Sequence, residues 1–144
     1  MNHIVHTVLG LPLVPAAGPL SALVSAAKLN YVSELPDPSC FAPDDEIPKS
    51  VLLVSFGELV LPEEIFDFFA RSGIRLPSLE TFFRLAAQYP GIEKERPCLC
   101  LPKDKGCAGR AGGVSLNGYR HNRYRFVDRM PLMGYCGHYY SLGV

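Results

Sequence analysis

The sequence contains no tryptophan, and only 19% of its 144 residues are charged. Without tryptophan, it lacks the strongest aromatic anchor of binding surfaces. A collagen-like period, a heptad run and a long lysine tract are also missing. The hydrophobic share of 48% argues against global disorder. The length fits one domain that can bury a core.

Catalytic signatures are absent as well. The chain has no G-x-S-x-G, P-loop, H-E-x-x-H or G-x-G-x-x-G motif. Cys136 and His138 stand two residues apart and would share one face of a strand. Catalytic Cys–His dyads usually form between residues that are distant in sequence, so this spacing does not indicate one. We therefore predict that the protein is not an enzyme and needs no cofactor.

The formal net charge is zero, but the two parts of the chain differ in sign. Residues 1–93 carry 5 basic and 11 acidic residues, whereas residues 94–144 carry 9 basic and 3 acidic ones. Such asymmetry indicates that an acidic scaffold and a basic C-terminal region do different work. Five of the seven tyrosines also lie in the basic region.

The first 27 residues carry no charge if the histidines are neutral. The apolar stretch 8–27 fits either the core of a weak secretory signal or a buried N-terminal strand and loop. A signal would make the protein secreted or surface-bound, but the start lacks Lys and Arg. Three prolines also interrupt any helix, so we expect no stable membrane span.

The five cysteines are residues of a type that can bind zinc, but their spacing in the sequence does not suit a zinc site. Four of them lie in the basic region, together with histidines: Cys98, Cys100, Cys107 and Cys136. C-x-C and C-x-H lack the turn of a C-x-x-C knuckle, so we predict no metal site. Zinc stabilisation, a disulfide in an exported protein and buried thiols remain open alternatives.

Composition divides the chain at residue 50. Residues 1–50 read as an apolar N-terminal segment followed, over 33–50, by an acidic proline-rich linker or surface loop. Residues 51–144 read as a single α+β domain that opens with a buried strand at 51–56.

Two helices follow this strand. Pro62 favours a helix start, and Gly73 favours its end, which predicts a helix over 62–72. Ser78 can cap a second helix over 78–89. The phenylalanines of both helices recur at helical spacing, which indicates core packing. From residue 90 onward no helical period is visible, and we expect loops and short strands.

Three short segments resemble motifs of one family, the Fibrobacter major paralogous domain. Residues 73–78 (GIRLPS), followed by Phe82 and Phe83, are similar to its G-x-R-L-P-T opening. Residues 116–120 (LNGYR) resemble its G-Y-R segment, and 134–141 (GYCGHYYS) its G-x-x-G-x-Y-W-S segment. The family is similar in architecture to C-type-lectin-like domains, including bacterial variable proteins diversified by retroelements. The sequence ends at Val144, where the family continues, as in a copy truncated at the C-terminus.

The resemblance implies a C-type-lectin-like fold, with two helices packed on a small, mostly antiparallel sheet and a long irregular C-terminal region. It also implies non-enzymatic binding of a protein or glycan on a Tyr/Arg-rich C-terminal surface. Tyrosine and arginine suit such surfaces because they offer rigid contact area and planar charged donors. The candidate residues are Tyr119, Arg120, His121, Asn122, Arg123, Tyr124, Tyr135, His138 and Tyr139.

The same C-terminal region supports an alternative partner, a single-stranded nucleic acid. Four arginines alternate there with aromatic residues: Arg120, Arg123, Arg125 and Arg129 with Tyr119, Tyr124 and Phe126. Cations can neutralise phosphates while aromatic rings stack on bases. No RRM, KH or helix-turn-helix signature accompanies them. Pairing of this basic region with the acidic 33–50 segment is the simpler explanation of its charge.

Overall fold

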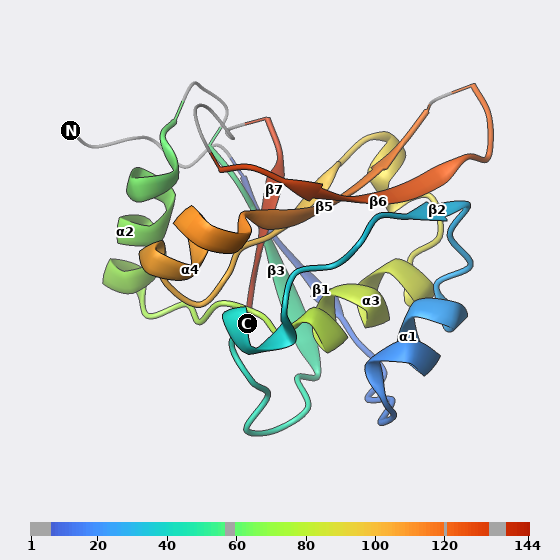
Figure 1. Ribbon diagram of the computed structural model, residues 1–144, viewed down its shortest axis with the longest axis horizontal. Coiled ribbons are helices and arrows are strands. Elements are labelled where there is room, and N and C mark those ends of the chain that lie inside the picture. The colour runs from blue at the N-terminus through green and yellow to red at the C-terminus, as the bar shows by residue number, and fades with distance from the viewer. Residues whose placement is uncertain (1–6, 57–59, 120, 133–137) are drawn as a thin grey trace.

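The computed structural model describes residues 7–56, 60–119, 121–132 and 138–144. These residues form four α-helices and one seven-stranded sheet, so the predicted α+β class is confirmed (Figure 1). The helices are α1 (Leu20–Ala26), α2 (Pro62–Ser72), α3 (Leu79–Gln88) and α4 (Lys105–Ala111). The strands are β1 (Thr7–Pro12), β2 (Tyr31–Val32), β3 (Ser50–Ser55), β4 (Cys98–Cys100), β5 (Gly113–Gly118), β6 (Arg125–Met130) and β7 (Tyr140–Gly143).

The sheet is mixed and has the order β1-β3-β7-β4-β5-β6-β2. β7 pairs parallel with β4 and β2 pairs parallel with β6, while the remaining neighbours are antiparallel. The prediction of a small sheet was wrong. β1 and β2 come from residues 1–50, which we had placed outside the domain, and the short strands expected after residue 90 join the same sheet. β7 lies between β3 and β4 rather than at an edge.

The sequence signals of α2 and α3 act as predicted. Pro62 is the first residue of α2, and Gly73 ends it in the left-handed conformation with φ of 73°. Ser78 caps α3, since its Oγ accepts a hydrogen bond from the Thr81 backbone N–H at 3.0 Å. Local sequence therefore sets these helix ends: a proline begins α2, a glycine ends it, and a serine caps the start of α3.

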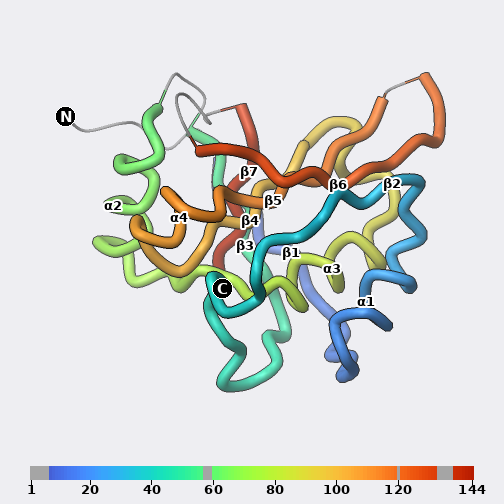
Figure 2. Tube along the Cα trace, viewed as in Figure 1, coloured from blue at the N-terminus to red at the C-terminus, as the bar shows by residue number. Residues whose placement is uncertain are grey.

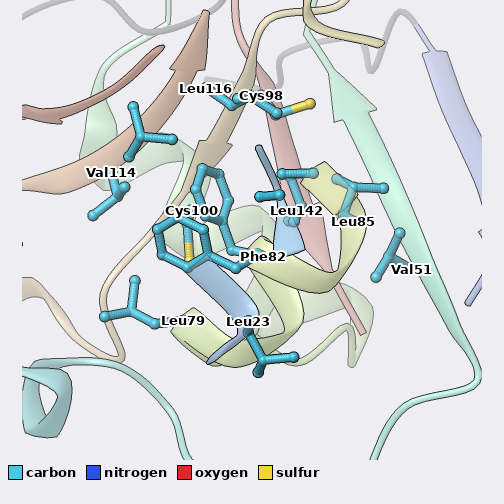
Figure 3. Packing of buried hydrophobic residues seen from close by; sticks show 14 of the residues in the cluster. Leu23, Val51, Leu79, Phe82, Leu85, Cys98, Cys100, Val114, Leu116 and Leu142 are labelled. Carbon is cyan, nitrogen blue, oxygen red and sulfur yellow. The ribbon is translucent and has the colours of Figure 1, made fainter. Parts of the chain in front are cut away.

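Each face of the sheet carries its own core. α1 and α3 cover one face, where their apolar side chains pack on strands β3 to β7, as in the cluster around Phe82 and Cys100 (Figure 3). α2 covers the other face over β3 and β4 through Ile65, Phe66 and Phe69. The helices therefore shield one face along most of its width and only part of the other (Figure 2).

The N-terminal part joins this architecture. β1 pairs with β3 along its whole length, α1 packs on α3, and β2 extends the far edge of the sheet. The acidic 33–50 segment includes a short 3-10 helix, η1 (Pro38–Cys40), and the buried Phe41. Asp44 fixes this segment to α3, because its carboxylate accepts a bond from Arg84 at 3.2 Å and one from Ser78 Oγ at 2.7 Å.

Helix α4 was not expected. Two glycines, Gly106 and Gly109, interrupt any apolar stripe, and the helix depends on its cap. The Asp104 side chain accepts the Cys107 backbone N–H at 2.7 Å, and Cys107 and Ala111 are buried beneath the helix. Across the described ranges, no helix has the length and apolar character needed to cross a membrane.

Candidate ligand-binding surface

The β5–β6 hairpin divides its residues between two environments by strand alternation. Leu116 lies opposite Val127, and both are buried in the core beneath α1 and α3. Asn117 lies opposite Phe126, and both point to the other face, where they are half-buried. Figure 1 shows α1 and α3 below β6 and β2, whereas α2 and α4 lie toward the other end of the sheet.

Aromatic rings gather on this uncovered part of the sheet. Tyr119 and Tyr124 each lie within 6 Å of Phe126, at ring-centroid distances of 5.7 and 5.9 Å, and 6.1 Å from each other. Tyr31 of β2 lies directly opposite Phe126 in the parallel register and so projects to the same face. The three tyrosines keep 41–54% of their surface exposed.

Polar side chains adjoin these rings. Asp128 follows Phe126 by two residues and shares its face, and Asn117 Nδ2 donates to Ser115 Oγ at 2.8 Å. We call this surface the aromatic face, and it consists of Tyr31, Asn117, Tyr119, Tyr124, Phe126 and Asp128. Flat exposed rings beside an amide and a carboxylate can hold a ligand by stacking and by hydrogen bonding.

The connection between β5 and β6 holds the central sequence candidates. His121, Asn122 and Arg123 are all exposed, and Arg120 lies outside the described residues. Asn122 Oδ1 accepts the Tyr124 backbone N–H at 2.9 Å, a local turn bond that fixes the loop. The structure thus brings Tyr119, the 121–123 loop and Tyr124 together at one end of the molecule.

Arg125 has a structural role that the sequence pattern did not reveal. Its guanidinium is buried and donates to Glu93 Oε1 at 2.5 Å, Ala27 O at 3.0 Å and Ala86 O at 2.8 Å. Glu93 comes from the short 3-10 helix η2 (Ile92–Lys94) and has a fully buried side chain. Arg125 therefore ties the hairpin to α1, α3 and η2 beneath the aromatic face.

Gly118 allows this arrangement. A Cβ at residue 118 would lie 2.9 Å from Glu93 Cγ, too close for an ordinary contact. The glycine lets η2 approach the end of β5, so the carboxylate reaches the arginine.

A second arginine of the basic region is also engaged internally. Arg129 Nε donates to Ala111 O at 2.9 Å, and its backbone N–H donates to Ser33 Oγ at 2.8 Å. Of the four arginines that favoured a nucleic acid, Arg125 and Arg129 thus stabilise the fold. Arg123 is left exposed beside the rings. We had also considered that the acidic 33–50 segment pairs with the basic region. The Asp44 carboxylate of this segment instead forms an ion pair with Arg84 of α3.

The remaining candidates lie elsewhere on the sheet. Tyr135 is outside the described residues, whereas His138 and Tyr139 precede β7, which β4 separates from β5. The His138 ring lies 4.2 Å from the Tyr139 ring, and Tyr139 packs against the core beneath α2. Tyr140 packs against the opposite core, as alternation predicts. His138 and Tyr139 are therefore not members of the aromatic face.

The cysteines of β4 are buried structural thiols. Burial raises the pKa of Cys98 to about 12 and that of Cys100 further still. The residues that the structure describes contain no group of three or more His, Cys, Asp or Glu side chains suited to a metal ion. Cys136, one of the possible ligands in the sequence, falls outside those residues.

A hollow of about 530 Å³ lies between α2, the 42–48 segment and residues 103–105. Its floor is apolar, from Phe66, Phe69 and Ile74, and its rim carries charges of both signs, including Asp45 and Lys103. Because the rim carries both positive and negative side chains, it favours no particular class of ligand. The aromatic face is the better candidate because three of its rings form one contiguous cluster beside polar groups that can hydrogen-bond to a ligand.

Of the six residues of the aromatic face, only Tyr119 and Tyr124 were among the candidate binding residues of the sequence. Phe126 and Asp128 continue the alternation that begins at Tyr124, and this pattern could have found them. Tyr31 carries no local signal, since only the β2–β6 pairing brings it to the site.

Comparisons with protein-family models, curated proteins and solved structures found no match.

Proposed function

We propose that the protein is a non-enzymatic binding domain that recognises a glycan on its aromatic face. One observation carries the proposal. Tyr119, Tyr124 and Phe126 form a contiguous ring cluster on a sheet surface over which no α-helix of the described residues packs, and both tyrosines are exposed. Monomeric soluble proteins generally shield contiguous apolar surface unless a partner uses it.

The surrounding groups favour a neutral, hydroxyl-rich ligand. A sugar ring presents a C–H face that stacks on an aromatic ring, and its hydroxyls bond to amides and carboxylates. Asn117 and Asp128 provide such groups next to Phe126. A nucleic acid is the weaker candidate, since Asp128 opposes phosphate and two arginines are engaged internally.

We extend the proposal to the family: the chain is a lectin-like variable protein. In its support, the described parts of the three segments that resemble the family lie at the ends of helices and strands. Residues 73–78 connect α2 to α3, 116–118 end β5, and 140–141 begin β7. In a diversified protein we expect related copies to vary at exposed positions such as His121 and Arg123. Arg125 should stay constant, because it is buried and makes three bonds.

The test is binding of the full chain to an array of oligosaccharides, followed by titration of the best ligand. Because the chain lacks tryptophan, its emission comes from seven tyrosines, three of which belong to the aromatic face, and a change that Tyr119→Ala or Tyr124→Ala removes reports contact there. Tyr119→Ala and Tyr124→Ala should each weaken binding at least tenfold, as truncation of a stacked ring removes about 1.4 kcal/mol or more.

A matched control removes exposed apolar surface away from the site. Val14 is 72% exposed, and Val14→Ala should leave affinity unchanged. Absence of glycan binding up to about 1 mM would overturn the proposal. Binding of oligothymidylate that falls steeply with salt would instead support the nucleic-acid alternative.

A further inference from the structure

Two cysteines from distant parts of the chain meet on the side of the molecule away from the aromatic face. Cys40 ends η1, and Cys107 lies in the first turns of α4. The Lys103 backbone N–H donates to Cys40 O at 2.9 Å, which holds the start of the α4 segment against η1. η1 and α4 are in direct contact, and the two thiols are close enough for each to act electrostatically on the other. Neither thiol is part of a disulfide.

The two thiols differ in access and in chemical surroundings. Cys107 is 3% exposed, whereas Cys40 is half-buried and open to small reagents. Arg110 Nη2 donates to Cys107 Sγ at 3.3 Å and can stabilise a thiolate there. Burial, the Cys40 thiol and the Asp104 carboxylate act against it and raise the pKa of Cys107. Access therefore makes Cys40 the site of first attack.

We propose that Cys40 and Cys107 form a reversible disulfide by exchange with oxidised glutathione. The Cys40 thiolate attacks one glutathione sulfur, which forms a mixed disulfide and releases one glutathione thiolate. The Cys107 thiolate then attacks the Cys40 sulfur, forms the protein disulfide and releases the second glutathione. The two protons lost by the protein thiols end on the two glutathione molecules, and the protein is oxidised by two electrons.

The bond would join the two walls of the 530 Å³ hollow. Residues 42–46, which begin two positions after Cys40, line one part of it, and residues 103–105, which end two positions before Cys107, line another. Oxidation would therefore fix their spacing, and reduction would release it. β4 offers no competing pair, since Cys98 and Cys100 are buried and their raised pKa values disfavour the thiolate.

The test incubates the reduced full chain with excess oxidised glutathione, quenches with acid and maps the cysteines by alkylation and peptide mass spectrometry. We expect one linked peptide pair, Cys40 to Cys107, that dithiothreitol removes. Cys98 and Cys100 should be alkylated only after unfolding. A linkage to Cys136, or full alkylation of Cys40 after prolonged oxidation, would overturn the proposal.

Single variants separate the two roles. Cys107→Ser should accumulate glutathione on Cys40, because no second thiol resolves the mixed disulfide. Cys40→Ser should accumulate little, because Cys107 is buried. Circular dichroism checks that each variant is folded, and Cys107→Ala replaces Cys107→Ser if the hydroxyl destabilises α4. Equal glutathione uptake by both variants would contradict the assigned order of attack.

Discussion

Removal of the Arg125 guanidinium is the most informative perturbation of the fold. The group makes three hydrogen bonds to buried partners, one of which is the fully buried carboxylate of Glu93. Glu93 Oε2 has no hydrogen-bond partner among the described residues. Arg125 thus provides the charge compensation that makes burial of this carboxylate tolerable.

Arg125→Met should destabilise the protein by about 3–5 kcal/mol, the usual cost of leaving a buried charge unpaired. A domain has only about 5–15 kcal/mol of stability, so this loss is large. Arg125→Lys keeps a charge but loses the planar fork that reaches three acceptors, so its cost should be intermediate. Urea titration by circular dichroism measures both variants. Arg125→Met should lower the midpoint by about 2 M, for a slope near 2 kcal/mol/M.

The double variant Arg125→Met/Glu93→Met separates charge burial from loss of packing. Methionine is unbranched, so it suits the close approach of Gly118 to the Glu93 side chain. The double variant should recover about 1–3 kcal/mol relative to Arg125→Met, because no charge is left buried. The carbonyls of Ala27 and Ala86 still lose their donor, so recovery is partial. A cost below about 1 kcal/mol for Arg125→Met, or strict additivity in the double variant, would refute the reasoning.

Three further predictions concern the scaffold. Gly112→Ala should cost about 2 kcal/mol or more in urea titration, because φ is 72° and the new Cβ would lie within 3 Å of a backbone oxygen. Gly73→Ala, with φ of 73° and open space, should cost only about 1 kcal/mol, and a reversed order would contradict this. Asp44→Ala should destabilise far more than Asp45→Ala, since only Asp44 neutralises a buried guanidinium; equal unfolding midpoints would contradict it. The free energy of unfolding should also fall between pH 9 and 12, because burial raises the pKa of Cys98 to about 12. In this range the Cys98 thiol ionises in the unfolded chain but stays protonated in the folded one, which costs about 1.4 kcal/mol for each pH unit. Urea titrations across this range, compared with Cys98→Ala, measure that contribution, and an unchanged slope in the variant would rule it out.

The parts of the fold that were predictable depend on local signals. Pro62, Gly73 and Ser78 marked both ends of α2 and the start of α3, and the apolar run at 51–56 marked β3. These residues act through their own backbone conformations or caps, so neighbouring sequence suffices.

The missed parts depend on distant partners. β2 has only two residues and forms because it pairs with β6. β1 lies at an edge of the sheet and depends on its pairing with β3. α4 has no apolar period and needs the Asp104 cap and the packing of Cys107. Topology, which no local window encodes, thus decided the size of the sheet.

The candidate surface shows the same division within eight residues. The run from Tyr119 to Phe126 appears in the sequence as one basic and aromatic tract, which favoured a nucleic acid and a glycan alike. Strand alternation separates it: Tyr124 and Phe126 face the open side, while Arg125 points into the core and binds Glu93. The buried arginine holds the strand that presents the rings. Loop residues 121–123 can therefore change without loss of the fold, whereas a change at 125 would disturb both the core and the surface above it.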